Sequence, residues 1–237
     1  MIGSFYDPNL ETLIHRRGRP HWAQDQVVVF ITFRAKDSIP REVITRWEHE
    51  RREWLARVLV TSGTRKNRGT NDRFISDSME CLTSLESKLT DDQRQEYQDH
   101  FRGMYQKTLD DCRGACVLKR PEIARIVADS LLYFDQDRYE LSDFVIMPNH
   151  VHLLAAFRSA TWMERQLSSW LRYTATRINR CIQSTNHFWQ QEAFDHLVRS
   201  PEQYDYFRHY IAENPAKAGL KSGEFFYYRR DEGQKFA

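Results

Sequence analysis

The sequence DFVIMPNHVHLLAAF, residues 143–157, consists of two short apolar runs joined at Met147-Pro148-Asn149. A proline fixes its own φ and an asparagine tolerates tight turns, so Pro148 and Asn149 favour a turn between two strands. The stretch therefore predicts an antiparallel β-hairpin.

The second predicted strand begins with His150-Val151-His152. Side chains two residues apart on a strand share a face, so both imidazoles point the same way and Val151 points to the opposite, packed face. Two neutral imidazoles on one rigid face form half of a divalent-metal site. The alternative is that these histidines only form hydrogen bonds at a sheet edge, and the spacing does not separate the two interpretations.

The composition is that of a globular chain, with 237 residues, 41% hydrophobic and 29% charged. No apolar run approaches the roughly 20 residues needed to span a bilayer, and the first residues do not resemble a secretory signal. We therefore expect a cytoplasmic protein with no membrane partner. The net charge of +2 is low for a dedicated duplex-DNA binder, although local basic patches can still contact phosphates.

Only two of the four cysteines, Cys112 and Cys116, are close in the sequence, and no second pair matches them. A structural zinc site is therefore not supported.

The order of predicted elements indicates an α+β chain. Residues 26–34 are rich in β-branched and aromatic side chains and predict a central strand. Helices are predicted over the ranges 38–60, 121–132, 161–182 and 201–214, with an extended segment over 187–198. This order predicts a ferredoxin-like antiparallel sheet with helices on one face, in a single domain covering residues 1–237.

Two details of this arrangement concern its boundaries. Residues 61–75 have loop composition and residues 76–111 look helical, so we expect a helical insertion over 61–111 within the domain. Pro215 disfavours helical geometry at the residue before it, so the last helix is expected to end near Asn214.

The last predicted helix offers a second half for the metal site. Tyr210 and Asn214 are four residues apart and lie on one helix face. A tyrosine oxygen can act as a nucleophile, and an asparagine carbonyl oxygen suits a hard cation. The commoner roles are a core aromatic for Tyr210 and a helix C-cap for Asn214. Tyr206, one turn before Tyr210, could be the nucleophile, a second nucleophile or a packing residue.

Basic and aromatic residues elsewhere suggest contacts with nucleic acid. The helix predicted over 161–182 carries four arginines that could contact a phosphate backbone or simply face solvent: Arg165, Arg172, Arg177 and Arg180. Trp189 could stack on a base, although burial of this ring is equally compatible with the sequence.

The chain resembles a known family over most of its length outside residues 61–111. Residues 147–154 resemble the His-hydrophobic-His signature of the single-tyrosine HUH transposases, and residues 210–220 resemble the tyrosine block of that family. Similarity to its REP-associated branch extends to the segments 29–34, 37–40 and 188–190 and to Asp195 and His196.

The resemblance implies a nuclease of the ferredoxin-like HUH fold that acts on single-stranded DNA carrying a palindromic hairpin. Tyr210 would be the nucleophile, and His150, His152 and Asn214 would bind one Mg²⁺ or Mn²⁺. Some relatives carry glutamine at the position of Asn214, and His196 matches a frequent histidine without an assigned role. The REP-associated relatives are typically monomeric, so a monomer is favoured over a homodimer.

The implied reaction cleaves and rejoins DNA through a 5′-phosphotyrosine, which conserves bond energy and needs no ATP. The absence of a Walker-type glycine-rich lysine loop agrees with this. One alternative is a non-catalytic module that binds DNA hairpins and derives from a transposase. A nucleotide hydrolase of the histidine-triad kind would need a third histidine where this chain has Leu154.

Overall fold

The structure is a computed structural model that describes residues 2–17, 19–63, 82–86, 88–191, 193–230 and 233–235. The chain divides into two compact units, one formed by Met1–Ser38 with Leu109–Ala237 and the other by Ile39–Thr108. Each unit is considered separately below. Residues 64–81 and 87, which belong to the insertion expected over 61–111, lie outside the described residues, so that boundary stays a prediction.

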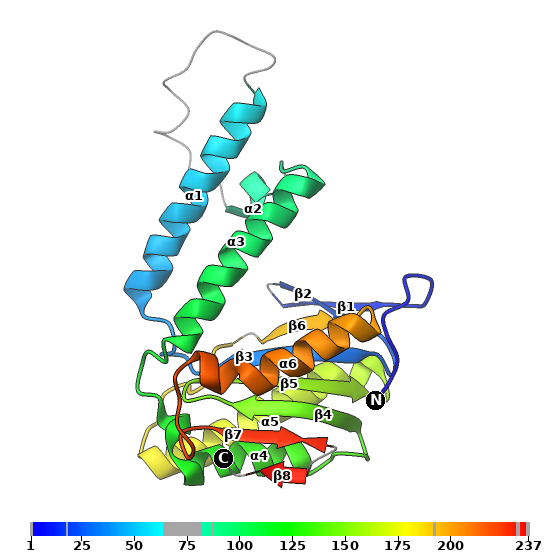
Figure 1. The fold of residues 1–237 in the computed structure, drawn as a ribbon, viewed down its shortest axis with the longest axis vertical. Coiled ribbons are helices and arrows are strands. Elements are labelled where there is room, and N and C mark those ends of the chain that lie inside the picture. The colour runs from blue at the N-terminus through cyan, green and yellow to red at the C-terminus, as the bar shows by residue number, and fades with distance from the viewer. Residues whose placement is uncertain are drawn as a thin grey trace. The chain divides into compact units, whose positions relative to one another are not determined.

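The larger unit contains a six-stranded antiparallel sheet with the strand order β6-β3-β5-β4-β7-β8 (Figure 1). Its strands are β3 (Val28–Arg34), β4 (Tyr139–Ile146), β5 (His150–Phe157), β6 (Phe194–Leu197), β7 (Phe226–Arg229) and β8 (Gly233–Lys235). A separate hairpin pairs β1 (Leu13–Arg17) with β2 (Arg19–Ala23). The four strands β6-β3-β5-β4, with one helix before β4 and one after β5, form a ferredoxin-like arrangement, which confirms the predicted fold class.

The predicted hairpin is formed by β4 and β5, which pair antiparallel across the turn at Met147-Pro148-Asn149. The backbone N–H of Met147 donates to the carbonyl oxygen of His150 at 2.8 Å and closes this turn. On the other side of β5 lies β3, so β5 and β3 are central strands that are buried on both faces.

Helices cover both faces of the sheet. On one face, α4 (Pro121–Leu132) and α5 (Ala160–Ile182) pack against alternate residues of the central strands, including Ile31 and Leu153. On the other face, α6 (Pro201–Lys217) packs against β4 and β5 and shares a core cluster with Phe30 and Leu154 (Figure 1). The helical layer on one face is present as predicted. The structure adds α6 on the other face, which the prediction of helices on one face did not include, because both sides of β3 and β5 are apolar.

The prediction that the last helix ends near Asn214 is wrong, because α6 continues to Lys217 with Pro215 inside it. A proline removes only one backbone donor, and this loss is tolerated because the helix ends within the next turn. Gly219, at φ +67°, donates to the carbonyl of Ala216, and Leu220 donates to the carbonyl of Pro215. This pair of bonds is a Schellman motif, so the capping position is taken by glycine and not by Asn214.

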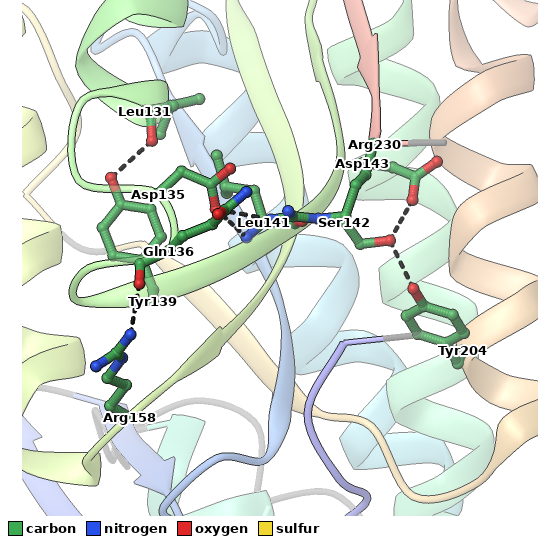
Figure 2. Close-up of polar contacts among 10 residues, drawn as sticks. All are labelled: Leu131, Asp135, Gln136, Tyr139, Leu141, Ser142, Asp143, Arg158, Tyr204 and Arg230. Atoms are coloured by element: carbon green, nitrogen blue, oxygen red, sulfur yellow. Dashed lines mark hydrogen bonds and ion pairs between the residues drawn. The ribbon is translucent and has the colours of Figure 1, made fainter. Parts of the chain in front are cut away.

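A bulge in β4 fixes α6 against the sheet. The register of β4 with β5 shifts between Leu141 and Phe144, at Ser142 and Asp143. The hydroxyl of Ser142 contacts the carboxylate of Asp143 and lies 2.6 Å from the Tyr204 hydroxyl of α6 (Figure 2). Nε of Arg208, one turn further along α6, donates to Asp143 at 2.9 Å. These buried bonds hold the helix that carries Tyr210.

The smaller unit is helical and has a core of its own. Its elements are α1 (Arg41–Gly63), α2 (Leu82–Glu86) and α3 (Asp91–Asp110, whose last two residues belong to the larger unit). Leu55, Leu89, Tyr97 and Phe101 form the buried centre of this core. Within the described part of the chain, no helix has both the length and the apolar character that crossing a membrane requires.

Candidate metal and nucleophile site

Strand β5 places His150 and His152 on the face of the sheet that α6 covers. Val151 and Leu153 alternate with them and lie in the core under α4 and α5, as the hairpin pattern predicted. Both imidazoles are fully buried, and their ring centroids are 4.6 Å apart. The two predicted ligands are therefore adjacent on one rigid strand.

The tautomer of His150 is determined by its neighbour Asn149. Nδ1 of His150 lies 2.8 Å from Oδ1 of Asn149, and Nδ2 of Asn149 donates to the carbonyl of Arg113 at 3.0 Å. Because a carbonyl oxygen can only accept, Nδ1 of His150 carries the proton and Nε2 keeps its lone pair. In the described part of the chain this buried Nε2 atom has no hydrogen-bond partner.

His152 is held between β3 and α6. Its Nδ1 atom lies 2.7 Å from Oγ1 of Thr32, the residue opposite it on β3. Its Nε2 atom lies 3.4 Å from the hydroxyl oxygen of Tyr210. The bond to Thr32 fixes the orientation of the ring and directs Nε2 toward the helix.

Both histidines are neutral at pH 7. Burial lowers the pKa of His150 to about 3, and the nearby guanidinium of Arg34 adds to this effect. Burial also lowers the pKa of His152 well below its ordinary value, with a further contribution from His150. Neutral imidazoles offer lone pairs, which is the form that binds a metal.

Tyr210 is the tyrosine of α6 that reaches the histidines. Its half-buried ring contacts His152 edge to face, with the centroids 5.2 Å apart, and also packs against Phe30. Tyr206 is 63% exposed and its ring packs against Phe207, so it does not share this position. The structure therefore shows which of the two tyrosines lies beside the histidines, a question that the sequence left open.

Asn214 lies one helical turn beyond Tyr210 and is fully buried. Neither Oδ1 nor Nδ2 of Asn214 has a hydrogen-bond partner among the described residues. Leaving a polar group buried without a partner costs roughly 1–3 kcal/mol, so such a group calls for an explanation. An amide oxygen is a suitable donor for Mg²⁺ or Mn²⁺, and this explains an orphaned amide better than the capping role does.

These donors fit a hard or borderline divalent cation. The described residues include no cluster of three or more His, Cys, Asp or Glu side chains that could hold a metal ion. A cation here would instead depend on His150, His152 and Asn214, a set of two imidazoles and one amide. Two of the three have buried donor atoms without a hydrogen-bond partner in the described chain, which is the observation that favours a ligand.

The four arginines of α5 lie far from this site in the fold. Their side chains are exposed on a helix that covers the opposite face of the sheet. Arg165, Arg172, Arg177 and Arg180 therefore share no face with Tyr210, and their contact with DNA stays a prediction.

The position of Trp189 does not agree with the prediction that its ring stacks on a base. Its ring is only 6% exposed, packs against Phe33 and donates from Nε1 to the Thr174 hydroxyl at 2.8 Å. A stacking platform needs an exposed ring face, so in this structure Trp189 is a core residue.

Three residues near the histidines were not identified as site residues from the sequence. Thr32 and Arg34 lie opposite His152 and His150 on β3, and Asn149 was interpreted only as a turn residue. The strand register brings these side chains together, and register is a tertiary feature. His196 lies on the same face of the sheet beside Phe207, and it still has no assigned role.

Comparison with known proteins gives little similarity. No protein-family model and no curated protein sequence matches the chain. One solved structure, of a REP-associated tyrosine transposase bound to a REP hairpin, is similar with 13% identity and a TM-score of 0.43. The alignment covers 87% of this chain and 76% of that one. At this level of similarity the function must come from the residues of the site itself.

Proposed function

We propose that this protein is a metal-dependent nuclease and strand transferase that acts on single-stranded DNA. The observation that carries the proposal is the position of the Tyr210 hydroxyl, 3.4 Å from Nε2 of His152, whose ring adjoins that of His150. The buried, unpartnered amide of Asn214 follows one helical turn after Tyr210. A nucleophile beside a candidate metal site suits metal-assisted phosphoryl transfer to tyrosine.

In the proposed reaction, the Tyr210 oxygen attacks the phosphorus of a DNA phosphodiester. A bond forms between the tyrosine oxygen and phosphorus, and the bond between phosphorus and the 3′ oxygen breaks. Tyr210 loses its phenolic proton, the leaving oxygen gains a proton, and the products are a 5′-phosphotyrosine and a free 3′-hydroxyl. The reverse attack by another 3′-hydroxyl rejoins the strand without ATP.

The neighbouring residues have definite roles in this proposal. His150, His152 and Asn214 would hold Mg²⁺ or Mn²⁺, which as a Lewis acid supplies positive charge to the scissile phosphate. Arg34, opposite His150, adds a permanent positive charge beside the same face. The bulge contacts of Asp143 hold α6 and thus the position of Tyr210.

The substrate that we propose is single-stranded DNA next to a palindromic hairpin, as the resemblance of the histidine and tyrosine blocks implies. A monomer is the proposed active form, and the cytoplasm is the proposed compartment. The resemblance supports the proposed substrate and the monomer.

The test is a denaturing gel of the purified protein with labelled single-stranded hairpin DNAs, with Mn²⁺ or with chelator. We expect a denaturation-resistant protein–DNA band that needs the metal, disappears in Tyr210→Phe and persists in the matched control Tyr206→Phe. His150→Ala should remove the metal-dependent band.

Two results would contradict the proposal. A covalent band that survives in Tyr210→Phe would remove Tyr210 as the nucleophile. Binding of hairpins by the wild type without any covalent band, across the library and with both metals, would favour the non-catalytic binding module.

A further inference from the structure

We propose that Asn149 is a positioning residue of the candidate metal site: it keeps the proton of His150 on Nδ1, so that Nε2 faces the site with a free lone pair. The purpose of this arrangement rests on the proposed function. The arrangement itself can be measured in the metal-free protein.

The first observation is the pair of hydrogen bonds that Asn149 makes. Its Oδ1 atom lies 2.8 Å from Nδ1 of His150, and its Nδ2 atom donates to the carbonyl oxygen of Arg113 at 3.0 Å. Rotating the amide by 180° would place Oδ1 against that carbonyl oxygen, and two acceptors repel each other. The carbonyl of Arg113 therefore directs Oδ1 toward the histidine.

The second observation is that the loop carrying Arg113 is itself fixed. The backbone N–H of Ala115 donates to the carboxylate of Asp37 at 2.8 Å. Gly114, between Arg113 and Ala115 in the chain, has φ +93°. A Cβ atom at this position would approach the carbonyl oxygen of Asp37 to 2.5 Å. Only glycine fits this approach, so the loop holds the Arg113 carbonyl in a defined place.

The third observation is burial. Asn149 and His150 are both fully buried, and in the described chain Nε2 of His150 has no hydrogen-bond partner. A histidine without an acceptor at Nδ1 would be free to adopt the Nε2–H form that neutral imidazole favours in water. That form places a proton on the nitrogen that faces the site, and a protonated nitrogen cannot bind a cation.

The chain Arg113 carbonyl–Asn149–His150 thus acts as an outer shell that orients a metal ligand. Outer-shell partners of metal-binding histidines commonly change metal affinity by about 10–100-fold when they are removed. The turn residue of the hairpin would in this way determine which nitrogen of the following histidine is available.

The first measurement is the tautomer of His150 in the metal-free wild type, by ¹⁵N–¹H correlation of the imidazole nitrogens. We expect a protonated Nδ1 and an unprotonated Nε2, and Asn149→Ala should shift His150 toward the Nε2–H form. A wild type with Nε2 protonated would overturn the inference without any variant. An unchanged Nδ1–H tautomer in folded Asn149→Ala would also overturn it.

The second measurement is Mn²⁺ binding by calorimetry, with thermal unfolding measured in parallel. Asn149→Ala should weaken binding by about 10–100-fold. The matched control is Asn179→Ala, in which an amide that donates to the Asn186 carbonyl is lost from α5; its Mn²⁺ affinity should not change.

Unchanged Mn²⁺ binding in folded Asn149→Ala would overturn the inference. A wild type that binds no Mn²⁺ contradicts the proposed function instead, and the tautomer measurement still tests the role of Asn149.

Discussion

At the scale of single residues, the amide of Asn214 is buried and polar, a combination that is unfavourable in the metal-free protein. Its amide is fully buried in α6 and has no hydrogen-bond partner in the described chain. A group of this kind lowers stability unless a ligand satisfies it. This combination makes stability and metal binding respond in opposite directions to one substitution.

We expect Asn214→Leu to raise the free energy of unfolding of the metal-free protein by about 1 kcal/mol or more, because an unsatisfied amide is removed from the core. The same variant should lose any rise in melting temperature that Mn²⁺ gives to the wild type. Chemical denaturation in chelator measures the first effect, and thermal unfolding with Mn²⁺ measures the second. Asn179→Leu serves as the control, and an Mn²⁺ response preserved in Asn214→Leu would exclude Asn214 as a ligand.

The buried histidines predict how stability depends on pH in the metal-free protein. The pKa of His150 is about 3 when folded against an ordinary value of 6.5, so only the unfolded chain takes up this proton between those values. Stability is therefore complete above pH 6.5 and is lost as the pH falls toward 3, by about 2 kcal/mol between pH 7 and 5 for this residue. His152 acts in the same direction.

The measurement is the free energy of unfolding in chelator at pH 7 and at pH 5. His150→Gln should show a smaller loss between the two values than the wild type, because glutamine does not titrate. An equal loss in both proteins would mean that His150 is not buried in its neutral form.

At the scale of elements, the loop between α3 and α4 is positioned by one glycine. Gly114 has φ +93° and lies against the backbone of Asp37, whereas Gly223 has φ +86° with open space around it. The two positions share an unfavourable backbone conformation for other residues but differ in packing. Their alanine variants therefore separate the two effects.

Gly223→Ala should lower the free energy of unfolding by about 1–2 kcal/mol, the cost of the left-handed conformation alone. Gly114→Ala should lower it further, because the new Cβ meets the Asp37 carbonyl, and it should also weaken Mn²⁺ binding by moving the Arg113 carbonyl. Denaturation and calorimetry on the two variants give the comparison. Equal destabilisation with unchanged metal affinity would show that this loop does not support the site.

At the scale of the whole molecule, the chain leaves the larger unit after Ser38 and returns to it at Leu109. The two connections meet, because the amide of Ala115 donates to the carboxylate of Asp37. All residues of the candidate site belong to the larger unit, and its sheet is complete without residues 39–108.

We therefore expect the larger unit to fold when Ile39–Thr108 is replaced by a short glycine-serine linker, since Asp37 before the gap and Ala115 after it are joined by a hydrogen bond. The shortened chain should show one cooperative unfolding transition and keep its affinity for Mn²⁺. Circular dichroism and calorimetry test this. Loss of cooperative unfolding would show that the helical unit is required for the fold of the sheet.

The local pattern of the sequence was sufficient for the elements and for the two histidines. The hairpin, the central strand β3 and the shared face of His150 and His152 follow from turn residues and from the period-2 alternation, which act over a few residues. The end of α6 was mispredicted because the local effect of Pro215 was outweighed by the Schellman motif one turn later.

The sequence alone thus determined the α+β order, the ferredoxin-like class and the candidate residues Tyr210, His150, His152 and Asn214. Only the tertiary structure decided that Tyr210 and not Tyr206 meets His152, that Trp189 is buried, and that Asn149 is held by the Arg113 carbonyl. Each of these depends on strand register, helix placement or loop packing between segments far apart in the chain. Such contacts leave no periodic signal in the residues that make them.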